Sequence, residues 1–184
     1  MRVFVLRHAE RSEHDATFHS PLIQDGLATA QSLAKTLASH NPRFKHIYSS
    51  PFVRCVQTIY PYCVQSATTP AVRIENALYE FIHEGGGHGP ATFRQSWDAE
   101  AYPQLNGCVD PSYASWWPLA AIEYNESEVA MKTRVRGFYH RLKEKHGDND
   151  VILLVTHQSP INALLSRPNT TPFPMGTIQE VVAN

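Results

Sequence analysis

Residues 3–8 read VFVLRH, and residues 151–157 read VILLVTH. Each stretch begins with an unbroken apolar run without polar alternation, which is typical of a strand buried on both faces of a parallel sheet. A histidine, His8 or His157, closes each stretch. Because ligands bind at the carboxyl ends of the strands in open α/β sheets, the two imidazoles are predicted to meet at that edge.

Helical and strand patterns alternate along the rest of the chain. Further strands are predicted at residues 46–48, 71–74 and 177–182. Helices are predicted at residues 25–38 with Asp25 as N-cap, at 126–146 and at 159–165. Another is predicted from Ser50-Pro51 onward, with Ser50 as N-cap and a bend or break at Pro61. Residues 76–81 are expected to form a short helical or irregular piece. This alternation predicts a three-layer α/β/α sandwich around a mostly parallel central sheet.

Length and composition point to one folded domain, which we expect to occupy residues 1–184. The 16 basic and 17 acidic residues give a net charge of −1, so we expect neither nucleic acid nor a membrane as a partner. The N-terminal apolar run is too short for a signal peptide or a membrane span, and the expected compartment is the cytoplasm. The spacing of Cys55, Cys63 and Cys108 indicates neither a disulfide framework nor a zinc site.

Residues 83–118 differ from the rest of the chain, because they carry glycines, prolines and all three tryptophans. We expect an irregular insertion that lies over the active site. Its aromatic residues could form an apolar wall for an organic leaving group, or they could give the insertion a small core of its own. The residues concerned are Trp97, Tyr102, Tyr113, Trp116 and Trp117.

Arginines gather around the predicted site. Arg7 and Arg11 flank His8, and Arg54 lies in the first turn of the helix that follows Ser50-Pro51. Helix N-termini attract anions, and the planar guanidinium fork matches the geometry of a phosphate. A cationic pocket in a nearly neutral chain therefore indicates a phosphate-bearing ligand.

Three motifs occur in order: LRHAER at residues 6–11, SSPFVRCVQT at 49–58 and VTH at 155–157, with PLIQDGLATAQ at 21–31 between the first two. With these motifs in this order, the chain resembles the histidine phosphatase superfamily, whose fold is phosphoglycerate mutase-like. The resemblance implies that Arg7, His8, Arg54 and His157 form the phosphate pocket, with His8 as nucleophile.

The first motif has the form R-H-x-E-R, which is similar to the motif of the phosphatase branch that contains the Sts and ecdysteroid-phosphate phosphatases. This similarity adds Arg11 to the predicted pocket and makes Glu80, in ALYEF, the matching acidic residue. One departure is Ala9, where the family most often has glycine; alanine is tolerated there unless the backbone needs a positive φ.

The expected activity is hydrolysis of a phosphomonoester through a phosphohistidine, without a metal or other cofactor. Neighbouring guanidinium groups would keep the imidazole of His8 unprotonated, as a nucleophile requires. Glu80 is the candidate general acid, and Glu84 could serve instead. The substrate would be a phosphorylated small molecule or a phosphopeptide, and an exposed edge strand or the tryptophans could support a homodimer.

Two other functions are weighed against this one. A phosphoglycerate mutase is disfavoured, because the chain is short for that role and its RHAER motif departs from the mutase pattern. A catalytically weak phosphate-binding or interaction protein is disfavoured by the complete set of pocket residues.

Overall fold

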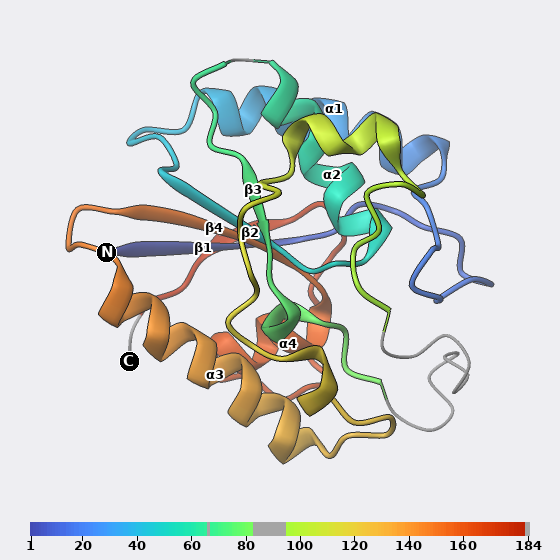
Figure 1. Ribbon diagram of the computed structural model, residues 1–184, viewed down its shortest axis with the longest axis vertical. Helices are drawn as coiled ribbons and strands as arrows, with labels where there is room; N and C mark the ends of the chain where they lie inside the picture. The colour runs from blue at the N-terminus through green and yellow to red at the C-terminus, as the bar shows by residue number, and fades with distance from the viewer. Residues whose placement is uncertain (66, 83–94, 183–184) are drawn as a thin grey trace.

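A five-stranded sheet runs through the centre of the computed structural model, which describes residues 1–65, 67–82 and 95–182 (Figure 1). Its strands are β1 (Arg2–Arg7), β2 (His46–Ser49), β3 (Val72–Ile74), β4 (Val151–Thr156) and β5 (Ile178–Glu180). The strand order is β3-β2-β4-β1-β5, and only β5 runs antiparallel to its neighbour, β1. The sheet is therefore mostly parallel, as predicted.

Two pairs of helices cover the sheet, one pair on each face. In Figure 1, α1 (Gln24–Ala38) and α2 (Val53–Val64) lie above it, and α3 (Glu128–Lys145) and α4 (Gln158–Leu164) lie below it. The 3-10 helices η1 (Asn76–Leu78), η3 (Pro103–Cys108) and η4 (Leu119–Ala121) occur in the connections. This arrangement is the predicted three-layer α/β/α sandwich.

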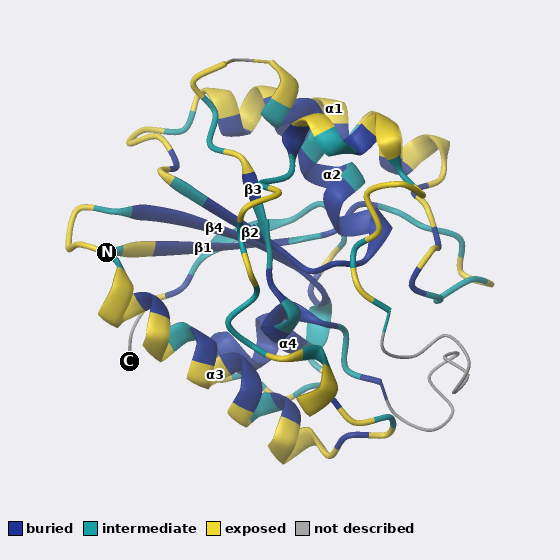
Figure 2. Ribbon diagram, in the orientation of Figure 1, coloured by how far each residue is buried: buried dark blue, intermediate teal, exposed yellow. Residues whose placement is uncertain are grey.

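The central strands are buried on both faces, which explains their continuous apolar runs (Figure 2). In β1, Phe4 and Leu6 belong to the core cluster shared with α1 and α2. Val3 and Val5 point the other way and belong to the cluster shared with α3 and α4. The sheet thus separates two apolar cores, and the rigid central strands hold their carboxyl ends in fixed positions.

Two predicted helix caps are wrong. Phe52, not Ser50, is the N-cap of α2, because the hydroxyl of Ser50 is engaged by His157 instead. Ile23, not Asp25, precedes α1, and the Asp25 carboxylate lies in the first turn, where the helix dipole favours it. Pro61 lies inside α2, so the predicted break does not occur, because the residues around it are held in the core. A bend at Pro61 stays a prediction.

Of the predicted insertion, only residues 95–118 lie within the described part of the chain. Trp116 packs on the main core, with ring centroids 5.7 Å from Tyr48 and 5.8 Å from Phe138. Trp97 stacks on Tyr102 at 5.5 Å, and both pack against the other cluster. The aromatic residues therefore extend the main cores and do not form a separate one, whereas a wall for a leaving group remains a prediction.

A buried carboxylate fixes the end of this segment. Glu75, directly after β3, accepts hydrogen bonds from the Tyr113 hydroxyl and the Ser115 hydroxyl, each at 2.7 Å, and from the Trp116 backbone N–H at 2.9 Å. Buried charge of this kind is stable only when it is fully hydrogen-bonded. The segment is thereby tied to the edge of the sheet beside η1, which leads to Glu80.

Across the residues that the structure describes, no helix has both the length and the apolar character to cross a membrane.

Candidate active site

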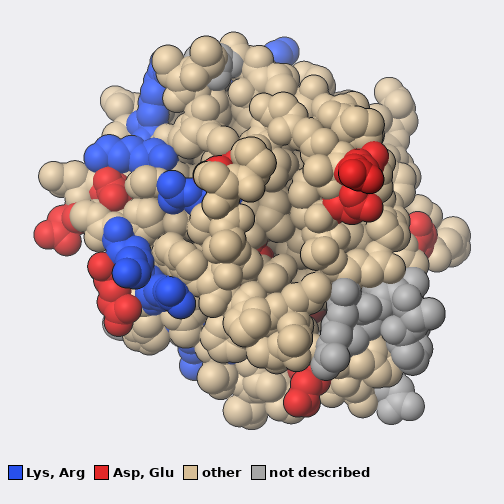
Figure 3. Space-filling view, viewed as in Figure 1, with Lys and Arg blue, Asp and Glu red and all other residues tan. Residues whose placement is uncertain are grey.

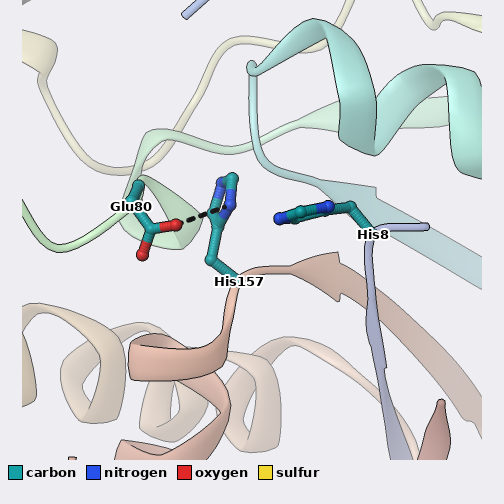
Figure 4. A group of neighbouring side chains, drawn as sticks. All are labelled: His8, Glu80 and His157. Carbon is teal, nitrogen blue, oxygen red and sulfur yellow. Dashed lines mark ion pairs between the residues drawn. The ribbon is translucent and has the colours of Figure 1, made fainter. Parts of the chain in front are cut away.

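His8 and His157 meet at the carboxyl edge of the sheet, because β1 and β4 are paired neighbours. Arg7 is in register with Thr156, and the His8 backbone N–H donates to the Thr156 carbonyl at 3.0 Å. The two imidazole rings lie 5.2 Å apart between centroids, at 64° to each other (Figure 4). The predicted convergence of the two histidines is observed.

His8 is held as a neutral imidazole with one free nitrogen. Its Nδ1 lies 2.8 Å from the Ala9 carbonyl, which can only accept, so Nδ1 carries the proton and Nε2 keeps a lone pair. Burial, and then the charges of Arg54 and His157, lower the pKa of His8 well below its usual value. Ala9 is buried without a positive φ, so alanine brings no backbone strain here.

His157 is fully buried and contacted on both ring nitrogens. Its Nδ1 lies 3.0 Å from Glu80 Oε2, and its Nε2 lies 2.9 Å from the Ser50 hydroxyl. Burial lowers the pKa of His157 to about 4, although the Glu80 carboxylate opposes this shift. The neutral ring therefore donates from Nδ1 to the carboxylate and accepts at Nε2 from the hydroxyl.

Glu80 lies beside the second histidine, not beside the first (Figure 4). Its Oε2 is also 3.7 Å from Arg54 Nη2, and its side chain is 20% exposed. Burial alone would raise the pKa of Glu80, but its interaction with the His157 ring and the charge of Arg54 outweigh burial and lower it. The carboxylate is thus ionised in this arrangement. Glu84, the alternative acid, lies outside the described residues.

Arg54 supplies a buried positive charge from the first turn of α2. It is fully buried, its Nη1 donates to the Thr17 carbonyl at 2.9 Å, and its guanidinium lies 4.4 Å from the centre of the Phe52 ring. Burial lowers the pKa of Arg54 to about 10, which still leaves it charged at neutral pH. Its Nε is buried and has no hydrogen-bond partner among the described residues.

Arg7 is held at the same edge by α4. Its Nη1 donates to Gln158 Oε1 at 3.0 Å and to the Phe173 carbonyl, while its buried Nε lacks a partner among the described residues. Unsatisfied buried donors on two arginines are costly unless an anion accepts from them. Arg11 differs, because its Nη1 donates to the Ser12 and Asp15 carbonyls of the following loop at 2.5 and 2.9 Å. Its role in phosphate binding stays a prediction.

Sequence reasoning missed two side chains that contact His157. The sequence predicts Ser50 to be a helix cap, because Ser-Pro after a strand is typical of a helix start. Cys55, whose spacing indicates neither a disulfide nor a zinc site, lies in the core with its Sγ 3.6 Å from His157 Nε2. Burial raises the pKa of Cys55 to about 12, so its thiol is not ionised and is no nucleophile at neutral pH.

The donor atoms of His8, Glu80 and His157 lie within 4.8 Å of one another, close enough for one metal ion to reach all three. The arginine charge beside them, above all that of buried Arg54, disfavours a cation at this point and favours an anion. The geometry therefore fits a phosphoryl group better than it fits a metal.

A family model described as the histidine phosphatase superfamily (branch 1) matches residues 3–177. The chain belongs to the histidine phosphatase superfamily. The match spans both histidine motifs and the segment with Arg54 and Glu80 between them, which confirms the resemblance seen in the sequence. In this superfamily member, His8, Arg54, Glu80 and His157 lie together at the carboxyl edge of the sheet.

Solved structures show the same fold. The alpha-ribazole phosphatase from Shigella flexneri is 23% identical, with a TM-score of 0.65 over 100% of this chain and 91% of that chain. The ecdysone phosphate phosphatase from Bombyx mori, solved in complex with tungstate, is 17% identical, with a TM-score of 0.63 over 95% of this chain and 83% of that chain. Both are named as phosphatases.

A curated relative is much longer than this chain. The transcription factor tau 55 kDa subunit of Saccharomyces cerevisiae is 24% identical over 162 residues, which cover 78% of this chain. The matched part is 33% of that protein, so the chain corresponds to about one third of its length.

Proposed function

We propose that this member of the histidine phosphatase superfamily hydrolyses phosphomonoesters through a phosphohistidine on His8. The observation that carries the proposal is the meeting of two neutral imidazoles, His8 and His157, beside a buried guanidinium, Arg54. A neutral ring supplies a nucleophile, and buried arginines supply the charge that a phosphoryl group needs. Membership of a superfamily that includes phosphatases supports the same reading.

The first step forms a bond from His8 Nε2 to phosphorus and breaks the bond from phosphorus to the ester oxygen. The hydrogen bond from Nδ1 to the Ala9 carbonyl stabilises the positive charge that develops on the ring. The guanidinium groups of Arg7 and Arg54 would stabilise the negative charge on the equatorial oxygens. No cofactor is needed for this step, because the arginines provide the electrostatic stabilisation.

The leaving oxygen takes a proton, which we assign to the Glu80 carboxyl. The protein's own charges lower the pKa of Glu80, but a dianionic phosphate beside it would shift that pKa upward. Substrate binding can thereby protonate the group that must act as an acid. In the second step, water attacks phosphorus, the bond to Nε2 breaks, and the proton of that water returns to Glu80.

The substrate we propose is a phosphorylated small molecule or a phosphopeptide. The structural neighbours named as alpha-ribazole and ecdysone phosphate phosphatases act, by those names, on small phosphomonoesters. The nearly neutral composition of this chain favours such a substrate over a nucleic acid.

Two weaker alternatives have distinct signatures. A phosphoglycerate mutase would keep its phosphoenzyme and would depend on a bisphosphate primer. An interaction domain would bind phosphate without turnover. The yeast relative, named as a transcription factor subunit, is the observation that favours this alternative.

The proposal is tested by measuring phosphatase turnover with protein that carries no histidine tag. Wild type, His8→Ala and the matched control His140→Gln, a surface histidine on α3, are assayed on nitrophenyl phosphate and on a panel of phosphometabolites and phosphopeptides. We expect turnover by wild type and control and none by His8→Ala, with all three folded. Substantial activity in folded His8→Ala would reject the nucleophile, and a wild type inactive on every substrate would favour the interaction reading.

A further inference from the structure

A second cluster of ionisable side chains lies at the opposite, amino edge of the sheet. His46 is the first residue of β2, Asp150 directly precedes β4, and His146 directly follows α3. The other ends of β2 and β4, at Ser49 and Thr156, lead to the active site. The cluster is therefore separated from the catalytic groups by the length of the strands.

The ligand atoms of this cluster have the spacing of a metal site. Asp150 Oδ2 lies 3.5 Å from His46 Nε2 and 3.6 Å from His146 Nδ1, and all three atoms lie within 4.8 Å of one another. Tetrahedral zinc has bonds of about 2.0–2.1 Å to nitrogen and oxygen, which puts neighbouring ligand atoms about 3.4 Å apart. The two distances to Asp150 are already close to that value.

We propose that His46, His146 and Asp150 bind a divalent transition-metal ion of the zinc class. Two imidazoles and one carboxylate form a donor set that suits such an ion, and a water molecule would complete the tetrahedron. The site is accessible, because the side chains of His46 and Asp150 are 24% and 18% exposed.

The surroundings orient the proposed ligands. The Tyr48 hydroxyl lies 2.9 Å from His146 Nε2, so this nitrogen can donate to Tyr48 while Nδ1 faces the metal. The Gly147 backbone N–H donates to Asp150 Oδ2 at 2.9 Å and fixes the carboxylate. Partners of this kind, which set the tautomer and angle of a ligand, are typical of metal sites. Burial also lowers the pKa of His46 and lowers that of His146 to about 4, so both rings are neutral at pH 7.

Two cations compete with the proposed metal. Lys45 Nζ lies 2.9 Å from Asp150 Oδ1, the oxygen that does not face the histidines. Arg73 Nη1 lies 3.3 Å from His46 Nδ1, which must carry a proton when Nε2 binds a metal, so Arg73 must turn away. The side chains of Lys45 and Arg73 are 57% and 32% exposed, so both can move. Figure 3 shows Lys and Arg side chains gathered along this side of the molecule.

This competition gives the proposal a specific signature. Removal of the Lys45 charge should tighten metal binding, whereas loss of a ligand should weaken it. An ion bound elsewhere on the surface would show no such opposite pair of effects, and the lysine variant leaves every proposed ligand in place.

Titration with Co²⁺ and Zn²⁺ tests the inference on the 184-residue chain, without a histidine tag and stripped with EDTA. We expect one ion per chain, with visible Co²⁺ bands of tetrahedral intensity that Zn²⁺ displaces. His46→Gln and Asp150→Asn should each weaken binding at least about tenfold, Lys45→Gln should tighten it, and His140→Gln should leave it unchanged.

One variant separates this site from the catalytic cluster. Binding in His8→Ala should equal that of wild type, since His8 belongs to the cluster at the other edge. Loss of binding in His8→Ala, an unchanged affinity in both His46→Gln and Asp150→Asn, or weaker binding in Lys45→Gln would each overturn the inference. The readout is metal affinity, so its result does not depend on phosphatase activity.

Discussion

The hydroxyl of Ser50 lies 2.9 Å from Nε2 of His157, and it reaches this ring from the end of the neighbouring strand β2. Together with Glu80 on Nδ1, at 3.0 Å, it fixes both the tautomer and the direction of the buried imidazole. The second histidine is therefore oriented from two sides. Ser50 thus acts in this account as a positioning residue, through His157.

Replacement of Ser50 by alanine should lower kcat/KM by roughly five- to tenfold, the equivalent of about 1 kcal/mol for one lost hydrogen bond. The pH profile should change with it, because Nε2 of His157 loses its donor. Ser49→Ala is the matched control, since the Ser49 hydroxyl donates to the Ser50 carbonyl and, among the described residues, not to His157. Full activity in Ser50→Ala, or an equal loss in Ser49→Ala, would argue against the positioning role.

Replacement of Glu80 by glutamine should slow turnover most for substrates with poor leaving groups. Loss of a general acid costs on the order of 10²–10⁴-fold when the leaving oxygen needs a proton. Nitrophenol leaves readily as an anion, so the loss of kcat/KM for nitrophenyl phosphate, which reports the first step alone, should be small; kcat falls for both substrates, because Glu80 also takes up the proton of the attacking water. The kcat/KM values for an alkyl and an aryl phosphate are compared; an equal loss for both, or none, would move the acid role to Glu84 or elsewhere.

Stability should fall as the solution becomes acidic between pH 6.5 and 4. The pKa of His157 is lowered to about 4 and that of His8 well below 6.5, both chiefly by burial, so the unfolded chain binds protons that the folded chain refuses. His146 adds to the same trend. The free energy of unfolding in urea should drop by at least about 1 kcal/mol from pH 7.5 to pH 5.

The slope of this pH dependence should be shallower in His157→Gln and unchanged in His140→Gln, whose exposed side chain has no part in the site. A stability that stays constant or rises as the pH falls would show that the histidines titrate normally.

Treatment with EDTA should leave phosphatase activity unchanged, because Arg7 and Arg54 supply the charge that a metal would otherwise provide. The proposed metal ligands His46, His146 and Asp150 lie at the other edge of the sheet and should not alter this result. Initial rates before and after chelation provide the measurement, and a loss restored by added metal would contradict the metal-free mechanism.

The catalytic edge could be predicted from the sequence because strand ends are local features. His8 and His157 each follow an apolar run, and parallel strands place such ends together. It was harder to predict which residues of a helix face the core. On α3, the spacing of Val129, Phe138 and Leu142 is typical of one apolar face; Phe138 and Leu142 are buried in the core, but Val129 is 74% exposed. Helix propensity predicts that a helix forms, but it does not predict which of its residues contact the core.

Contacts between distant residues could not be predicted. Arg134 is fully buried, pairs with Glu126 and donates to the Ala77 carbonyl at 2.8 Å and the Tyr79 carbonyl at 3.1 Å. Arginine is mostly a surface residue, so no sequence pattern marks this one as the support of the segment before Glu80. The cluster at the amino edge is likewise assembled only by the fold.

Trapping of the phosphoenzyme tests the central claim most directly. Protein is mixed with substrate, quenched in alkali, in which phosphohistidine survives, digested and analysed by mass spectrometry. We expect one phosphorylated peptide, modified on His8, which is absent from His8→Ala and accumulates in Glu80→Gln during turnover of nitrophenyl phosphate. Phosphate on another residue, or rapid turnover with no phosphoenzyme at any time, would contradict it.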